Sequence, residues 1–590
     1  MRLLSAAAAL CAMLIGLPAA DPAPKPPKLD PKIAAERRAA QSLLKSLSLR
    51  DRVGQLVVAI SYGNVPSTQS TEYMQFRHWI RDLHIGGIIV INHVQYGLLR
   101  YIDPHVMALS LNNLQKMSKI PLIIGADFER GASMRVSDTT KFPYAMAYGA
   151  ARDLDATRVA GLITAREARA LGVQWVFAPD ADVQNNPANP VINIRAYGEN
   201  PDDVAAHVAA FIDGAHSDPK NVVLLSAKHF PGHGDTDTDS HTDLPTLDAA
   251  ADRIRAVEMK PFQAAIAHGV DSIMTAHIMA PALDSAGVPS TVSRKVLTGL
   301  LREELGFQGI IVTDALTMAG IRKVYGDGEA AVRALEAGAD VLLAPPNPEV
   351  AIRAVVAAVE KGRIPRRRID DAAEKVLQAK VHVGLMKNKL VDLDAISAAL
   401  DSKEAEAHAQ SVADRAVTLV RNEQNVVPLA APDKACLVAS SGIRLSSFGQ
   451  KLAEEFHKRA PHARVVFVDN VLPPVALDAV LGDPSTCSAI VFATFTTNPL
   501  LKGDLAPFVQ KLSEGPVPVV FVSLGNPYLV TPFPKVAAYM AAFNAAPTGE
   551  IAVVKALLGE IAITGKLPVS IPDFGQYGDG LQLPASHPAH

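Results

Sequence analysis

The chain reads VVLLSAKH from Val222 to His229, an apolar run that ends in two basic side chains. A short apolar run without polar alternation is typical of a strand buried on both faces of a parallel sheet. Burying charged groups without partners is costly, so their position directly after the run is unlikely to be random. The stretch therefore predicts a parallel strand whose carboxyl end carries chemistry.

Seven further apolar runs alternate with amphipathic segments between about residues 36 and 390. The eight expected strands are Gly54–Ile60, Gly87–Ile91, Pro121–Asp127, Val173–Asp182, Val222–His229, Asp271–His277, Gly309–Asp314 and Ala339–Ala344. Helices are expected between them, for example at Ala249–His268 and Asp327–Ala337. The alternation predicts an α/β fold, with a TIM-like (β/α)8 barrel over residues 36–395, and a large doubly wound sheet is the alternative.

Titratable side chains gather at the carboxyl ends of these expected strands. They are Asp127, Asp182, Lys228, His229, His277 and Asp314. In a (β/α)8 barrel this end is the face on which the βα loops form the active site. The pattern therefore favours one site over scattered structural charges.

A second domain is expected over residues 400–590. Its predicted strands are Val417–Arg421, Ala435–Ser440, Arg464–Asp469, Ala489–Ala493, Pro518–Leu524 and Val536–Ala542, and its clearest helix is Ser446–Ala460. Strands separated by helices indicate a smaller α/β sandwich with a mostly parallel sheet. Its polar residues form no constellation comparable to that of the first domain.

The N-terminus has the pattern of an export signal. Arg2 precedes an apolar run that ends near small residues, which predicts a cleaved signal peptide over residues 1–20. The run is shorter than the roughly 20 residues of a membrane span, and the residues around Cys11 fit a lipid-attachment site poorly. A Pro-rich linker is expected at residues 21–35. The protein is therefore expected to be exported, to a periplasmic or extracellular location.

The composition argues against a nucleic-acid partner and does not decide whether the cysteines form a disulfide. A net charge of -3 provides no basic surface for nucleic acid. Three cysteines are present, and one would leave with the signal. For Cys436 and Cys487 we favour two buried, unpaired thiols over a single bridge.

The loop that follows the quoted strand has three possible interpretations. Residues 228–245 read KHFPGHGDTDTDSHTDLP. A calcium loop fails because Ser240 and Thr246 stand where glycine and glutamate are needed, and the histidine spacing matches no zinc motif, so we predict no metal. A solvated acidic loop is the second interpretation.

Acid/base chemistry is the third interpretation. Asp239 precedes His241 by two residues, and in an extended loop such side chains point the same way. The carboxylate would orient the imidazole ring and stabilise its cation. A histidine held in this way is able to protonate a leaving group and later deprotonate water.

At this loop the chain resembles glycoside hydrolase family 3, in its β-N-acetylglucosaminidase branch. That branch has Lys-His-Phe/Ile-Pro-Gly-His-Gly, then Asp-Ser-His and a proline four residues later, all of which occur between Lys228 and Pro245. The resemblance implies that His241 is the general acid/base and Asp239 its partner. This pair would replace the usual second carboxylate.

The expected strand Gly309–Asp314 continues into a second matching segment. Residues 309–318 read GIIVTDALTM. Taken alone, Asp314 is equally compatible with a helix N-cap. The family has its nucleophilic aspartate in a similar Thr/Ser-Asp-Ala-Leu-x-Met segment, which implies that Asp314 is the nucleophile.

The resemblance also implies a sugar-binding set: Asp127, Arg135, Arg195, Lys228 and His229. The first two belong to a segment similar to the family's Asp-x-Glu-Gly-Gly turn, in which Arg130 replaces a usual glycine. His277 is compatible with a supporting or a structural role.

These features predict a retaining β-N-acetylhexosaminidase that forms a covalent glycosyl-aspartate on a small glycan, such as a peptidoglycan or chitin fragment. No cofactor is expected. A neutral histidine repels anions less than a carboxylate does, so phosphate is a conceivable replacement for water. The alternatives are a β-glucosidase or β-xylosidase of the same family, and a catalytically silent glycan-binding protein of the cell envelope.

Overall fold

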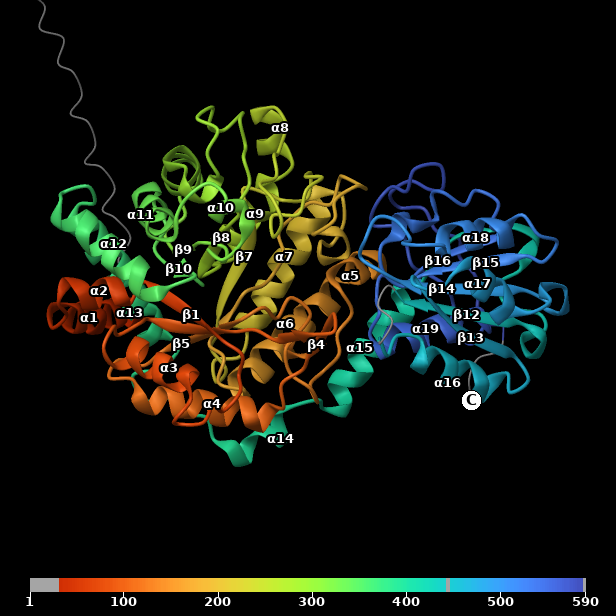
Figure 1. Ribbon diagram of the computed structural model, residues 1–590, viewed down its shortest axis with the longest axis horizontal. Helices are drawn as coiled ribbons and strands as arrows, with labels where there is room; N and C mark the ends of the chain where they lie inside the picture. Colours follow the sequence, from red (N-terminus) through yellow and green to blue (C-terminus); the bar gives the residue numbers. More distant parts are fainter. Residues whose placement is uncertain (1–30, 442–445, 587–590) are drawn as a thin grey trace, which may run out of the picture.

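A computed structural model of the protein describes residues 31–441 and 446–586, which form two domains side by side (Figure 1). The expected signal peptide and residues 21–30 of the expected linker lie outside this described part. Helix α1 (Pro31–Lys45) begins at Pro31, so residues 31–35, which we expected in the linker, are helical.

All eight predicted strands of the first domain form one parallel sheet. They are β1 (Val57–Ser61), β2 (Gly87–Val90), β5 (Ile123–Ala126), β6 (Trp175–Val176), β7 (Leu224–Phe230), β8 (Ser272–Thr275), β9 (Ile310–Val312) and β10 (Leu342–Leu343). Their order is β10-β1-β2-β5-β6-β7-β8-β9. A parallel bridge between Val312 and Val341 joins the two ends, so the sheet is a nearly closed barrel. The predicted barrel is thus confirmed, and the doubly wound alternative is wrong.

Helices surround this barrel. They are α2 (Leu49–Gly54), α3 (Thr71–Arg81), α4 (Pro104–Met117), α5 (Ala145–Ala151), α6 (Leu154–Ala170), α7 (Pro201–His216), α8 (Ala251–Ala256), α9 (Met259–Ala267), a π-helical segment at Lys295–Glu304, α10 (Ala319–Arg322), α11 (Asp327–Ala337), α12 (Pro348–Glu360), α13 (Arg366–His382) and α14 (Ile396–Ala399). Several start at a proline that follows an Asp or Asn cap, as α4 does after Asp103. The helix expected at Ala249–His268 is instead two helices, α8 and α9.

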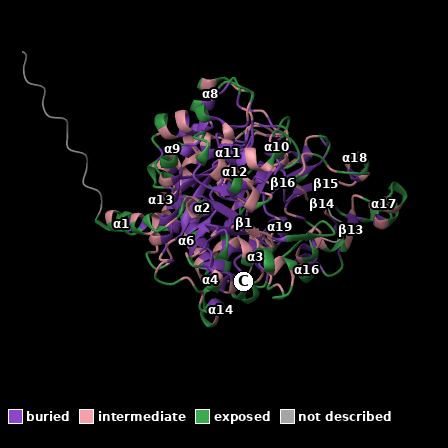
Figure 2. Ribbon diagram, turned by 60° about the vertical axis from the view of Figure 1, so that its left-hand side comes forward, coloured by how far each residue is buried: buried purple, intermediate pink, exposed green. Residues whose placement is uncertain are grey.

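The strands are apolar because both of their faces are covered (Figure 2). Side chains such as Ile124 and Leu225 are fully buried. Inside the barrel, the indole N–H of Trp175 donates to the hydroxyl of Ser272 at 2.8 Å. The buried indole nitrogen of Trp175, one of the largest fully buried side chains, thus has a hydrogen-bond partner.

The second domain has the predicted mostly parallel sheet. Its strands are β11 (Thr418–Asn422), β12 (Cys436–Ser441), β13 (Arg464–Asp469), β14 (Ile490–Phe495), β15 (Val519–Ser523) and β16 (Ala538–Ala541), in the order β11-β16-β15-β14-β12-β13. Only β11 pairs antiparallel, with β16. The helices are α15 (Lys403–Ala416), α16 (Gln450–Arg459), α17 (Pro474–Leu481), α18 (Leu505–Ser513) and α19 (Pro547–Leu557).

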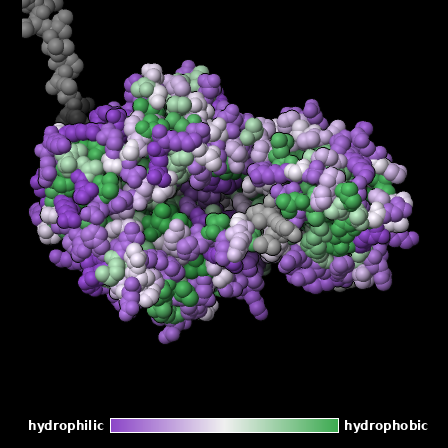
Figure 3. Space-filling model, in the orientation of Figure 1, coloured by the Kyte–Doolittle hydropathy of each residue, from purple (hydrophilic) through white to green (hydrophobic). Residues whose placement is uncertain are grey.

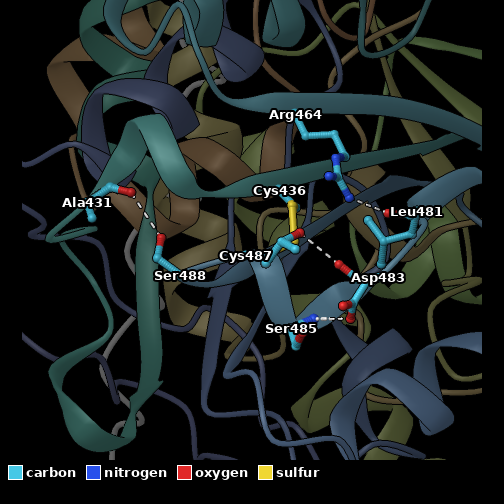
Figure 4. The surroundings of a disulfide bond; sticks show 9 residues. Ala431, Cys436, Arg464, Leu481, Asp483, Ser485, Cys487 and Ser488 are labelled. Carbon is cyan, nitrogen blue, oxygen red and sulfur yellow. Dashed lines mark hydrogen bonds between the residues drawn. A yellow bond between two sulfur atoms is a disulfide. The ribbon is translucent and has the colours of Figure 1, made fainter.

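Cys436 and Cys487 form a disulfide with a Cα–Cα distance of 5.6 Å (Figure 4), so our prediction of unpaired thiols is wrong. Cys436 begins β12, and Cys487 lies just before β14. These two strands are parallel neighbours although β13 lies between them in the sequence. The pairing depends on strand order, which cysteine spacing does not reveal.

The junction of the two domains lies beside the carboxyl-end loops of the barrel. A cleft of about 530 Å³ there is lined from both sides, by Tyr101 and Arg130 of the barrel and by Phe448 and Phe495 of the second domain. The molecular surface is hollowed between the domains (Figure 3). Tyr101 directly follows a short hairpin of β3 (His93–Gln95) and β4 (Leu98–Arg100).

In the described part of the chain, no helix is long and apolar enough to cross a membrane.

Candidate active site

The carboxyl end of β7 places Lys228 at the centre of a charged network. The Lys228 Nζ lies 2.9 Å from Asp127 Oδ1 and 2.6 Å from Glu129 Oε1. Arg135 reaches the other oxygen of Asp127 at 2.7 Å. Burial lowers the pKa of Lys228, but the carboxylates of Asp127 and Glu129 outweigh it and raise that pKa above its usual value. Asp127 therefore contacts two other residues of the predicted sugar-binding set, Lys228 and Arg135.

Arg195 joins the same network from the loop before α7. Its guanidinium donates two hydrogen bonds to Glu129, at 2.9 and 2.7 Å, and its Nε lies 3.2 Å from Asp180. A forked contact of this kind fixes both side chains in orientation. Burial raises the pKa of Glu129, but Arg195 and Lys228 outweigh it and hold that pKa well below its usual value.

His229 completes the network on the opposite side. Its Nδ1 lies 2.8 Å from Asp182 and 3.2 Å from Asp180. Burial lowers the pKa of His229, but these two carboxylates outweigh it and raise the pKa to about 10. His229 is therefore an imidazolium at neutral pH.

With His229 charged, the network balances. It contains the carboxylates Asp127, Glu129, Asp180 and Asp182 and the cations Arg135, Arg195, Lys228 and His229. Buried charges are tolerated when each has a partner of opposite sign. Glu129 and Asp180 were not among the residues predicted from the sequence. For Glu129 the signal was its place as the glutamate of the Asp-x-Glu-Gly-Gly-like segment, and for Asp180 it was its position two residues before Asp182.

The ligand atoms of Asp180, Asp182 and His229 lie within 4.8 Å of one another, which is close enough to hold a metal ion. However, His229 Nδ1 carries a proton toward the carboxylates, and Arg195 occupies another side of Asp180. These donors are thus committed to ion pairs, and we assign no metal to them.

Asp239 and His241, which we predicted to form an acid/base pair, contact each other in the loop. The Nδ1 of His241 lies 2.8 Å from Asp239 Oδ1, and the same oxygen accepts the backbone N–H of His241 at 2.8 Å. The His241 side chain is 59% exposed. The hydrogen bond with Asp239 is the main cause of a raised pKa for His241, and the charge of Asp314 adds to it. Because Nδ1 faces Asp239, Nε2 is left for another partner.

Asp314 lies two residues after β9 and is half-buried. Burial raises its pKa, but the charge of His229, the N–H of Ala315 and the charge of His241 outweigh it, so the pKa is lowered. Asp314 is therefore an anion at neutral pH. The alternative interpretation as a helix N-cap is wrong, because α10 begins after Met318.

His277 supports the backbone beside Asp314. Its Nε2 lies 3.1 Å from the carbonyl of Ala315, and its Nδ1 lies 2.8 Å from the hydroxyl of Thr291. Burial lowers the pKa of His277. Both ring nitrogens of His277 therefore have partners, and these contacts fix the backbone beside Asp314.

The model of the glycosyl hydrolase family 3 N-terminal domain matches residues 48–379, more than half of the chain. The chain belongs to glycoside hydrolase family 3. It is 28% identical to a β-N-acetylglucosaminidase/β-glucosidase from Cellulomonas fimi over 90% of this chain and 95% of that protein. It is 38% identical to β-hexosaminidase A from Pseudoalteromonas piscicida over 48% of this chain and 49% of that protein.

A solved family 3 structure has the same two-domain fold. It is a β-N-acetylglucosaminidase from Paenibacillus sp. str. FPU-7, with a TM-score of 0.80 and 32% identity. The match covers 89% of this chain and 99% of that chain. The similarity to this structure therefore extends beyond the matched N-terminal domain into the second domain.

Proposed function

We propose that the protein is a retaining β-N-acetylhexosaminidase that removes terminal β-linked N-acetylglucosamine from glycans. The observation that carries the proposal is the Asp239–His241 pair, whose imidazole is exposed and electrostatically coupled to the half-buried anion of Asp314. Related proteins whose names include this activity support the same assignment.

The first step forms a glycosyl-enzyme. An oxygen of Asp314 attacks the anomeric carbon, and the bond from that carbon to the glycosidic oxygen breaks. The proton on Nε2 of His241 moves to the departing oxygen. The raised pKa of His241 supports this role, because it keeps the acid form populated toward neutral pH.

The second step releases the sugar. Neutral His241 takes a proton from water, whose oxygen attacks the anomeric carbon while the bond to Asp314 breaks. Two inversions give overall retention of the β configuration. The same histidine thus serves as acid and then as base, and Asp239 keeps its ring in one orientation throughout.

The sugar-binding set is Asp127, Arg135, Arg195, Lys228 and His229. Their charges cancel within the network, which suits a neutral sugar whose hydroxyls need donors and acceptors. The ion pairs also hold each side chain before the substrate arrives, which lowers the entropic cost of binding.

We further propose that the protein acts outside the cytoplasm, on peptidoglycan or chitin fragments. The N-terminal sequence pattern supports export. The Cys436–Cys487 disulfide supports it independently, because such bonds persist mainly in oxidising compartments. Fractionation of cells, with thiol labelling of the recovered protein, tests both points. Cytoplasmic protein with free thiols would contradict the proposal.

The decisive assay compares an aryl β-N-acetylglucosaminide with the matching β-glucoside, for wild type and Asp314→Ala. We expect turnover of the N-acetyl substrate, and a loss on the order of 10⁴-fold or more in the variant. Faster turnover of the glucoside would overturn the sugar assignment, and an active Asp314→Ala would overturn the nucleophile. Folded wild type that turns over neither would contradict an enzymatic role. Repeating the assay with added phosphate distinguishes hydrolysis from phosphorolysis.

A further inference from the structure

Between the two exposed residues of the acid/base pair lies a buried one. Ser240 is only 2% exposed, whereas the side chains of Asp239 and His241 are 33% and 59% exposed. From Asp237 to Asp243, Ser240 is the only buried residue, while His233 and Thr236 just before this stretch are buried as well. The contacts of Ser240 therefore decide where the pair lies.

We propose that Ser240, anchored by His233 and Gly320, is the positioning residue that holds the Asp239–His241 pair over the nucleophile. This inference rests on the proposed role of His241 as acid/base. The chemical step itself involves neither Ser240 nor His233.

The first anchor is a hydrogen bond of 2.9 Å between Ser240 Oγ and Nε2 of His233. Its direction follows from the other contacts. The Thr236 hydroxyl donates to the carbonyl of His233 at 3.0 Å, so its oxygen accepts the Nδ1–H of His233 at 2.7 Å. Burial keeps His233 neutral by lowering its pKa to about 4. Nε2 is thus a lone-pair acceptor, and the Ser240 hydroxyl donates to it.

His233 is itself fixed to the rigid part of the site. Its backbone N–H donates to Asp182 Oδ1 at 2.6 Å, and its carbonyl accepts from the side chain of Asn189 at 2.8 Å. Asp182 also pairs with His229. Through His233, Ser240 is therefore held in place by the buried charge network.

The second anchor joins the two catalytic loops. The backbone N–H of Gly320 donates to the carbonyl of Ser240 at 3.1 Å. A Cβ on Gly320 would lie 3.1 Å from three carbonyl oxygens, those of Asp243, His277 and Ser240. The close approach leaves little room for a side chain. Gly320 lies in α10, six residues after Asp314, so this contact ties the acid/base loop to the segment that follows the nucleophile.

Misplacing a catalytic group by about 1 Å can cost on the order of 100-fold in rate. Displacing the general acid should slow reaction of a poor leaving group more than that of a good one, because a poor leaving group depends more on protonation. We therefore compare kcat/KM for phenyl and 2,4-dinitrophenyl β-N-acetylglucosaminides, since kcat/KM reports the glycosylation step. The ratio of the two values for one enzyme is independent of the fraction of protein that is folded.

For Ser240→Ala we expect kcat/KM on the phenyl substrate to fall about 10–100-fold, with less than about a threefold change on the dinitrophenyl substrate. Gly320→Ala perturbs the same junction from the other loop and should give the same asymmetry. Thr238→Ala is the matched control, because its exposed hydroxyl contacts only the side chain of Asp237 in this loop. It should leave both values unchanged.

An equal loss on both substrates, or no loss on either, in Ser240→Ala would show that Ser240 does not position the acid. His241→Ala separates this failure from that of the proposed function. If His241→Ala has the leaving-group asymmetry and Ser240→Ala does not, the positioning role is wrong. If His241→Ala also lacks it, the acid/base assignment itself is wrong.

Discussion

Two histidine–aspartate pairs in this site have the same contact and opposite surroundings. In each, Nδ1 lies 2.8 Å from a carboxylate oxygen, Asp182 for His229 and Asp239 for His241. The His229 side chain is 8% exposed, and that of His241 is 59% exposed. The carboxylates of Asp180 and Asp182 outweigh burial and keep His229 protonated at neutral pH. Exposure on a loop leaves His241 free to exchange its proton with substrate and water.

The comparison teaches that a histidine–carboxylate contact does not define a role by itself. In the proposed mechanism, His229 contributes charge and rigidity to the sugar side of the site, and His241 contributes a transferable proton. Equivalent substitutions of the two carboxylates should therefore have different consequences.

Asp182→Asn should have the largest effect, because it removes a charge from a buried and balanced network. It would leave the His229 cation short of a partner, at a cost of about 3–5 kcal/mol in the free energy of unfolding. Activity should fall with it, since His229 and His233 both depend on this carboxylate. Urea unfolding followed by circular dichroism measures the loss. An unchanged midpoint would contradict the view that the network is a structural unit.

Asp239→Asn should separate activity from stability. We expect a loss in kcat/KM of about 10²–10⁴-fold, with the free energy of unfolding within about 0.5 kcal/mol of wild type because the loop is exposed. Since the hydrogen bond with Asp239 is the main cause of the raised pKa of His241, the pKa should fall in the variant.

The pH profile of Asp239→Asn tests whether the pKa of His241 falls in the variant. The acid form of His241 is lost as pH rises through its pKa, so the alkaline limb of kcat/KM should move to lower pH in Asp239→Asn. Asp237→Asn is a suitable control, because that carboxylate is in the same loop and contacts Thr238 rather than His241. A limb that stays in place, or moves to higher pH, would refute the assignment of that limb to His241.

The sequence predicted the barrel and the acid/base pair for the same physical reason, which is that both are local. An apolar run such as Ile310–Val312 needs no partner to be recognised, and Asp239 and His241 are two residues apart. The disulfide and the pairing of Arg195 with Glu129 were not predicted, because each joins segments whose proximity depends on the fold. The single helix expected at Ala249–His268 breaks near Glu258, whose buried carboxylate pairs with Arg253.

The pH dependence of the folding stability tests the charge of His229 in the buried pair. The pKa of His229 rises from 6.5 to about 10 on folding. Its stabilisation is therefore complete below pH 6.5 and is lost as pH rises toward 10, by at most about 1.4 kcal/mol for each pH unit. Lys380 acts in the opposite direction, because burial lowers its pKa from 10.5 to about 7. Between these values the unfolded chain binds more protons, so this contribution to stability rises with pH.

The two contributions are separable by substitution. His229→Gln should remove the contribution that declines between pH 6.5 and 10, so the slope of its unfolding midpoint against pH should be more positive than that of wild type. Lys380→Met, whose side chain is bonded to Gln55, should remove the opposing contribution, so its slope should be more negative than that of wild type. Unfolding curves at pH 6, 8 and 9.5 measure both slopes. If His229→Gln follows the wild-type slope, His229 is not a fixed cation, and the two histidine pairs differ in exposure but not in charge.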